Sequence, residues 1–183
     1  MVKYVKLYKW ANKSERRRTV LKILDYVAVG AVVLIYLGYL AYLFITDGTE
    51  PMVRAVVFSA LPLGLFSFFR KSLNAPRPYE VMNFEEMGFP VPSKKKGSSF
   101  PSRHVFSATL IATMMLLRLP IVSVITFLFA ILLATVRVMR GVHFMRDVTV
   151  GALVGAVGGV IALLVFGVSL IGEGLQIMNK EVD

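Results

Sequence analysis

Residues Val136–Asp147 read V-R-V-M-R-G-V-H-F-M-R-D and bring three arginines, a histidine and an aspartate between two apolar runs. Charged side chains are costly beside a membrane, so ionisable residues at such a junction are candidates for function. His143 and Asp147 are four residues apart, a spacing that predicts one helix face with the two side chains one turn apart. The other histidine of the chain, His104, stands in the run F-P-S-R-H. We predict that both runs contribute to one site.

Around this stretch, apolar residues come in long blocks. The 183-residue chain is 56% hydrophobic with a mean hydropathy of +0.69, which is typical of a multi-span membrane protein. We predict an all-α fold, a polytopic transmembrane helical bundle of about five spans, in a single membrane-embedded domain over residues 1–183. Asp25, at the start of the first span, is expected at a solvated helix end, and the glycines of the last span suit close helix packing. The predicted spans are Ile23–Ile45, Met52–Phe69, Pro101–Leu117, Ile121–Thr135 and Asp147–Ile171.

The positive charge of the chain favours membrane partners. Its formal net charge is +10, but the cations sit beside hydrophobic spans, and no motif interleaves them with stacking aromatics as nucleic-acid binding would need. We expect anionic lipid headgroups as partners and no nucleic acid. Residues 1–22 carry eight Lys or Arg with interleaved aromatics and are predicted to form a basic amphipathic segment on the membrane surface. A frayed basic tail is the alternative. The sequence predicts no particular oligomeric state.

The segment at residues 70–103 is too long to be an idle connection in a compact bundle. We predict that it is an active-site loop. Its Lys94–Lys96 run is expected to be a solvated or lipid-facing charge run, with substrate capture as the alternative. We expect Arg140 and Arg146, in the other charged stretch, to contact headgroups or to act as positive-inside residues rather than to take part in catalysis.

These residues match what a membrane enzyme needs to remove phosphate from a lipid. A phosphomonoester carries nearly two negative charges and is held best by arginine forks. A neutral imidazole can attack phosphorus when a carboxylate orients it, and a second, protonated imidazole can serve as the acid. Asp147 is placed to orient His143, and His104 stands at a helix start behind Ser102, where an anion is favoured. We expect a clamp of cations to hold the phosphate, formed by Arg77 and Arg137 with Arg70 or Lys71 as a third member.

Three segments resemble the signature of the type 2 phosphatidic acid phosphatase family, membrane lipid phosphate phosphatases related to vanadium haloperoxidases. The first has Arg70, six residues, then Arg77-Pro78. The second is Pro101-Ser102-Arg103-His104, and the third has Arg137, five residues, His143, three residues and Asp147. The signature covers Arg70–Asp147, and the flanking spans extend the resemblance over most of the chain.

The resemblance implies a role for each of these residues. His143 would be the nucleophile that forms a phosphohistidine, Asp147 its partner and His104 the general acid. The phosphate would be held by Arg70, Lys71 as the neighbouring cation, Arg77, Ser102, the Arg103 backbone N–H and Arg137. The resemblance implies no metal and no cofactor.

Three positions depart from the family pattern. Arg70 stands where the family usually has lysine, with Lys71 one position away. Arg103 replaces a glycine, and Val136 replaces a serine. None of these changes removes a catalytic group, so we expect them to bear on substrate preference and rate.

The sequence therefore predicts a metal-independent phosphatase that hydrolyses the phosphomonoester or diphosphate of a membrane lipid. Candidate substrates are phosphatidylglycerol phosphate, phosphatidic acid and undecaprenyl diphosphate. One alternative is a lipid phosphotransferase, which passes the phosphate to another lipid instead of to water. Another is a non-catalytic member that binds or moves phospholipids. A complete set of acid, nucleophile and cation clamp argues against the latter.

Two arguments about membrane sidedness point in opposite directions. The positive-inside rule puts the basic amino terminus in the cytoplasm, and five spans then put both motif loops there as well. Members of the family commonly have six spans and an extracytoplasmic site. We favour a cytoplasmic site at the interface of the cell membrane.

Overall fold

The computed structural model describes the backbone of residues 2–93 and 95–180 and the side chains of residues 4–93 and 95–165. Met1 and Lys94, which belong to predicted segments, lie outside the described residues, and so do the side chains at the end of the last predicted span. The described residues form seven α-helices and no β-strand. The predicted all-α fold is therefore confirmed.

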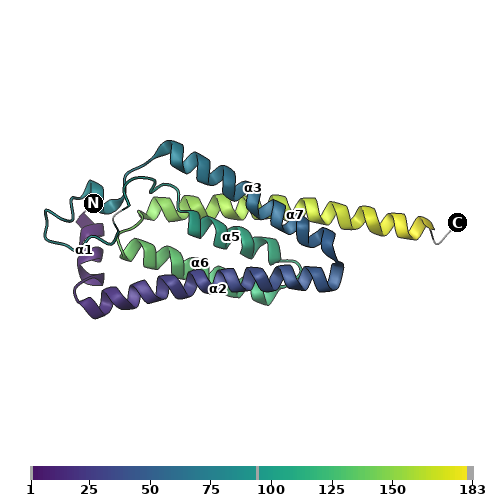
Figure 1. Cartoon of the computed structure of the whole chain (residues 1–183), viewed down its shortest axis with the longest axis horizontal. Coiled ribbons are helices and arrows are strands. Elements are labelled where there is room, and N and C mark those ends of the chain that lie inside the picture. The colour runs from purple at the N-terminus through teal and green to yellow at the C-terminus, as the bar shows by residue number, and fades with distance from the viewer. Residues whose placement is uncertain (1, 94, 181–183) are drawn as a thin grey trace.

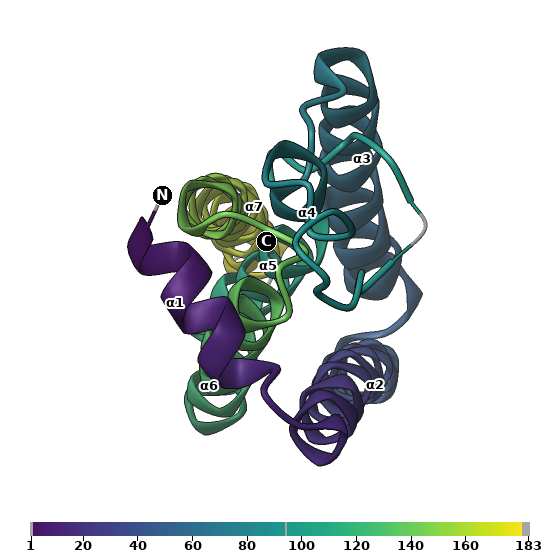
Figure 2. The same cartoon turned by 90° about the vertical axis from the view of Figure 1, so that its left-hand side faces the viewer.

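Five of the helices run side by side along the long axis of the molecule, and two short helices lie at one end (Figure 1). The five bundle helices are α2 (Glu15–Asp47), α3 (Thr49–Leu73), α5 (Arg103–Met115), α6 (Pro120–Met139) and α7 (Met145–Lys180). The short helices are α1 (Val2–Ala11) and α4 (Pro78–Val81). Viewed from their end, α1 crosses the bundle next to α6, and α4 lies beside α3 (Figure 2).

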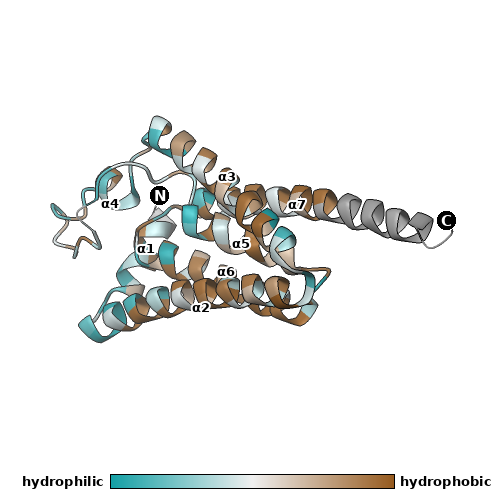
Figure 3. Ribbon diagram, turned by 45° about the vertical axis from the view of Figure 1, so that its right-hand side comes forward, coloured by the Kyte–Doolittle hydropathy of each residue, from teal (hydrophilic) through white to brown (hydrophobic). Residues whose placement is uncertain are grey.

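Four bundle helices are long and apolar enough to cross a membrane, namely α2, α3, α6 and α7. Hydrophobic residues cover these helices, whereas hydrophilic residues gather at the end that carries α1 and α4 (Figure 3). The predicted third span is different, because α5 has only 13 residues. At 1.5 Å per residue it extends about 20 Å, less than the roughly 30 Å of a hydrocarbon core. Most of its side chains are buried, so α5 is a short helix inside the bundle, and the described residues contain four helices of full spanning length instead of five.

Close packing of α7 on α5 confirms the role expected for the small residues. A Cβ at Gly151 would come within 2.6 Å of the Ser102 carbonyl oxygen. Added Cβ atoms at Gly155 and Gly159 would likewise collide with α5, at the Phe106 carbonyl and the Thr113 side chain. These glycines therefore let two backbones approach closely, and the contact at Gly151 holds the start of α5 against the start of α7.

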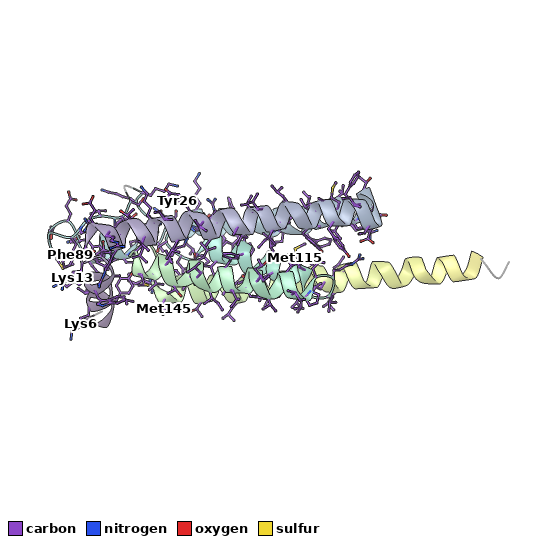
Figure 4. All side chains as sticks on the ribbon, turned by 90° about the horizontal axis from the view of Figure 1, so that it is seen from below. Lys6, Lys13, Tyr26, Phe89, Met115 and Met145 are labelled. Atoms are coloured by element: carbon purple, nitrogen blue, oxygen red, sulfur yellow. The ribbon has the colours of Figure 1, made fainter. Side chains whose placement is uncertain are left out.

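The basic amino-terminal segment is divided into two parts. Its first part is α1, and its second part is the first two turns of α2, which begin after Ser14; the Ser14 hydroxyl accepts a hydrogen bond from the Arg17 N–H at 3.3 Å. One side of α1 is buried in the protein through Tyr8, while Trp10 remains 59% exposed. Lys6, Lys13 and Phe89 of the long loop all lie at this end of the molecule (Figure 4).

Candidate active site

The three signature segments meet at the end of the bundle where α3 and α6 end and α5 begins. Backbone and side-chain hydrogen bonds join them. Arg70 Nη1 donates to the Pro101 carbonyl at 3.2 Å, and the Ser102 N–H donates to the Asp147 carbonyl at 2.9 Å. Arg77 Nη1 lies 3.5 Å from the Val142 carbonyl oxygen. Residues separated by up to about 75 positions in the sequence are thus held in one place.

His143 lies in the turn between α6 and α7, two residues before α7 begins, and not on a helix face as its spacing to Asp147 predicted. The helix breaks because Gly141 has φ +72°, in the region that favours glycine. A side chain at Gly141 would also collide with the rings of Tyr8 and Phe84. The predicted neighbourhood of His143 and Asp147 is nevertheless present, because the turn brings the imidazole over the first turn of α7.

Asp147 is fully buried, and its carboxylate contacts several neighbouring residues. Oδ2 lies 3.5 Å from His143 Nδ1 and accepts a hydrogen bond from the Phe144 N–H at 3.0 Å. The second contact caps the start of α7. The Ser99 hydroxyl donates to the same oxygen at 2.5 Å and lies 3.5 Å from His143 Nδ1. The sequence analysis did not single out Ser99, which stands in the loop run G-S-S of residues 97–99. The 3.5 Å separations are long for hydrogen bonds, but catalytic hydrogen bonds often tighten only when substrate binds.

The His143 side chain is 1% exposed, and its surroundings favour the neutral imidazole. Burial lowers its pKa from 6.5 to about 4, and the positive charges of Arg70, Arg137 and Arg77 act in the same direction. The neighbouring Asp147 opposes the shift but does not cancel it. A neutral ring whose Nδ1 faces a carboxylate presents its Nε2 lone pair on the opposite side, as a nucleophile requires.

His104 is the second residue of α5 and follows Ser102, which occupies the N-cap position as predicted. Burial lowers the pKa of His104 to about 3, with further lowering by Arg137, Arg103 and the other imidazole. A bound anion would offset the part of this pKa lowering that comes from the arginines. Two buried polar atoms here, Ser102 Oγ and His104 Nδ1, have no hydrogen-bond partner among the described residues.

Arg77 is the most firmly held of the predicted phosphate-binding arginines. It precedes α4 and is buried, and its Nε donates to the Gly97 carbonyl at 3.0 Å. Glu80, which sequence reasoning did not single out, fixes this corner by accepting from the N–H groups of Arg77 and Gly97 at 3.3 and 2.7 Å. The position of the Arg77 guanidinium therefore depends on residues from both ends of the long loop.

Asp25 lies in this site and is not solvated, contrary to the expectation from its place near the start of the first span. It is 5% exposed, and its Oδ1 lies 3.0 Å from Arg137 Nε. Arg140 donates to its other carboxylate oxygen, so the headgroup contact expected for Arg140 is wrong. The Arg146 side chain is 68% exposed, with Nε 3.6 Å from Asp147 Oδ1. Asp25 thus supplies α2 with a buried anchor for Arg137.

One cavity is lined in part by His104, and a second is lined by arginines of the predicted phosphate clamp. An apolar cavity of about 460 Å³ lies between α2, α3 and α5, and His104 is one of its lining residues, together with Val32, Tyr36, Leu63 and Leu110. A basic pocket of about 410 Å³ contains Arg70 and Arg77 as well as the two remaining predicted residues, Lys71 and Arg103. The site therefore borders an apolar cavity and a positively charged pocket.

Among the described residues, no group of three or more His, Cys, Asp or Glu side chains is placed to hold a metal ion. The predicted independence of metals is a matter for chelation experiments.

Comparisons with known proteins show which structures and which family the chain resembles. The chain resembles the crystal structure of Aquifex aeolicus LpxE with a TM-score of 0.61 and 27% sequence identity over 87% of this chain and 93% of that one. It also resembles a transmembrane PAP2-type phosphatidylglycerolphosphate phosphatase from Bacillus subtilis, with a TM-score of 0.63 and 20% identity over 88% of this chain and 83% of that one. No curated protein matches the chain in sequence. The sequence model of the PAP2 superfamily matches residues 51–170, well over half of the chain. This multi-pass membrane protein therefore belongs to the PAP2 superfamily, and its relatives support a lipid phosphatase.

Proposed function

We propose that this protein hydrolyses the terminal phosphate of a membrane lipid through a phosphohistidine on His143. The observation that carries the proposal is the convergence of a buried, neutral His143, its carboxylate neighbour and three arginines on one point beside His104. A structural role alone would not require a second imidazole next to this set. The roles follow from the geometry together with the family resemblance.

In the first step, Nε2 of His143 attacks phosphorus and the bond from phosphorus to the lipid oxygen breaks. His104 gives its proton to that leaving oxygen. Asp147 stabilises the imidazolium that forms on His143, because its carboxylate lies against Nδ1. Arg70, Arg77 and Arg137 compensate the negative charge of the transferring group, together with the hydroxyl of Ser102 and the backbone N–H of Arg103.

In the second step, a water molecule attacks the phosphohistidine and the phosphorus–nitrogen bond breaks. The now neutral His104 takes the proton from this water. The low pKa of His104 in the unliganded protein agrees with such a cycle, since a bound phosphate dianion offsets the surrounding guanidinium charges and raises that pKa toward the working pH. The same group can then act as acid and afterwards as base.

The apolar cavity supports a lipid as the substrate. Its walls come from α2, α3 and α5, and it reaches His104, so a hydrocarbon chain can lie in it while the phosphate occupies the cation clamp. Phosphatidic acid, phosphatidylglycerol phosphate and undecaprenyl diphosphate all fit this description. Soluble phosphate esters should bind more weakly, because they gain nothing from the apolar walls of this cavity.

The test is phosphate release by the purified protein from these three lipids. We expect His143→Ala to lower turnover by about 10⁴-fold or more, as removal of a nucleophile does in other hydrolases, with unfolding temperature and lipid binding close to those of the unmodified protein. Unchanged turnover in this variant would refute the assignment. A chelator should leave the rate unchanged, and loss of activity on chelation would contradict the metal-independent mechanism.

We further propose that the site faces the cytoplasm. The α1 helix contacts the catalytic turn, so the basic amino terminus lies at the same end as the site, and the positive-inside rule assigns that end to the cytoplasm. The chain has no cysteine, so single cysteines can be labelled cleanly. In sealed cells, an impermeant maleimide should label Thr49→Cys, at the opposite end of the bundle, and spare Lys96→Cys. Labelling of Lys96→Cys alone would place the site outside.

A further inference from the structure

The basic pocket that contains Arg70 and Arg77 holds more positive charge than one phosphate group neutralises. Its charged lining residues are Arg70, Lys71, Arg77, Lys95, Lys96 and Arg103, and none of its lining residues is acidic. A phosphomonoester carries at most about two negative charges near neutral pH. The two arginines that belong to the catalytic clamp match such a group. The other four cations of the pocket exceed what such a group needs.

The loop that carries two of these lysines is held in place over the pocket. The Tyr79 hydroxyl donates to the Lys95 carbonyl, and the Ser98 N–H donates to Asn74 Oδ1 at 3.2 Å. Gly97 adopts φ +65°, and a side chain at this position would collide with Asn74. The backbone under Lys95 and Lys96 is therefore fixed from α4 and from the end of α3. Both lysines stay at the rim of the pocket even though their side chains are exposed.

Arg103 adds to this charge at the position where the family pattern has glycine. Arg103 is the first residue of α5, and its exposed side chain lines the pocket. Lys71, which directly follows the clamp residue Arg70 in the sequence, lines the same pocket. The backbone N–H of Arg103 is oriented by the helix, because Arg103 is the first residue of α5. The replacement of glycine by Arg103 therefore adds a cation to the pocket.

We propose that this pocket is a second anion subsite, which binds another phosphoryl group of the substrate headgroup while the first is hydrolysed. The inference rests on the proposed function and narrows it. It favours lipids that carry two phosphoryl groups, either as a diphosphate or as a terminal monoester next to a phosphodiester. A lipid with one phosphomonoester leaves four cations without a counter-charge and binds less tightly.

The experiment compares three lipids with matched hydrocarbon chains in the same detergent. They are a phosphatidic acid, a phosphatidylglycerol phosphate and a prenyl diphosphate. We expect kcat/KM to be at least tenfold higher for one or both of the two-phosphoryl lipids than for phosphatidic acid. Which of the two is preferred identifies the linkage that the subsite accepts. Similar values for all three lipids would overturn the subsite and leave the phosphatase assignment intact.

A double variant tests the residues. In Lys95→Ala/Lys96→Ala, the preference for the two-phosphoryl lipid should fall about tenfold through KM, because each exposed ion pair contributes roughly a factor of three. The control is Lys13→Ala/Arg16→Ala, which removes two exposed cations near the same end of the protein without touching the pocket. It should change kcat/KM equally for all lipids. Equal loss of preference in both double variants would mean general attraction of anions and would refute the subsite.

Competition by inorganic ions provides a readout without turnover of lipid. Pyrophosphate should inhibit more strongly than phosphate, and the difference should shrink in Lys95→Ala/Lys96→Ala and at high salt, where charge interactions are screened. Equal inhibition by the two ions would contradict the proposal. If no lipid yields phosphate and His143→Ala matches the unmodified protein, the proposed function itself fails, an outcome distinct from the loss of preference.

Discussion

Replacing Asp25 by asparagine keeps the size of a buried side chain in α2 and removes the charge that Arg137 and Arg140 share. The two guanidinium groups would then face each other in a largely buried site with no counter-charge. Breaking a buried ion pair by removing one partner costs about 3–5 kcal/mol. For a chain of this length, such a loss lowers the unfolding temperature by roughly 10 °C. Arg137 would also lose its fixed orientation, so we expect kcat/KM to fall at least about tenfold, which equals about 1.4 kcal/mol.

The assay is thermal unfolding in detergent together with phosphate release, and α2 supplies its own control. Asp47, at the opposite end of the same helix, pairs with Arg118, and both side chains are about one-quarter exposed. Asp47→Asn should therefore cost less than about 1 kcal/mol and leave turnover unchanged. Adding Arg140→Gln to Asp25→Asn should recover part of the lost stability, because it removes one of the two unpaired charges.

The reasoning would be refuted if Asp25→Asn and Asp47→Asn had the same unfolding temperature and the same kcat/KM. An Asp25→Asn variant that is destabilised but fully active would refute only the part that concerns Arg137 orientation.

Three further predictions concern the catalytic turn and the helix packing. Because burial lowers the pKa of His143 from 6.5 to about 4, the unfolded chain binds more protons there than the folded protein. The contribution of neutral His143 to stability is therefore complete above about pH 6.5 and is lost as the pH falls toward 4. Across this range, a plot of unfolding temperature against pH should have a flatter slope for His143→Gln than for the unmodified protein. Ser99→Ala removes a donor to Asp147 and should lower kcat about tenfold in phosphate release while the protein stays folded, and an unchanged kcat would exclude a positioning role. Gly155→Ala should destabilise the protein by a few kcal/mol, because its Cβ meets the α5 backbone, whereas Gly38→Ala, where an added Cβ meets no atom within 4 Å, should be neutral or slightly stabilising in the same unfolding assay.

Local chemistry was readable from the sequence where it depends on spacing. The helical bundle followed from the apolar blocks, and the glycines of the last span correctly predicted its close contact with another helix. The proximity of His143 and Asp147 was also predicted, although the supporting structure is a turn. Spacing of four residues cannot distinguish a helix face from a turn that folds onto the first turn of a helix, and Gly141 was the sign that the latter applied.

Features that depend on distant parts of the chain were not readable. Asp25 seemed to be an end residue because its partners, Arg137 and Arg140, lie more than 110 positions away. The short helix α5 seemed to be a span because a helix buried on all sides is as apolar as one that faces lipid. Ser99 gave no signal, since a serine in a G-S-S run is ordinary loop composition and only the folded chain brings it to Asp147.

The position of α1 sets an order for the assembly of the protein. Its Tyr4 hydroxyl donates to the backbone carbonyls of Val138 and His143 at 3.2 and 3.1 Å, a separation of up to 139 residues along the chain. During synthesis the amino-terminal helix emerges first, but its docking surface exists only after α6 has been made. Closing so long a loop costs chain entropy, and α1 can brace the catalytic turn only after the chain has been made as far as His143.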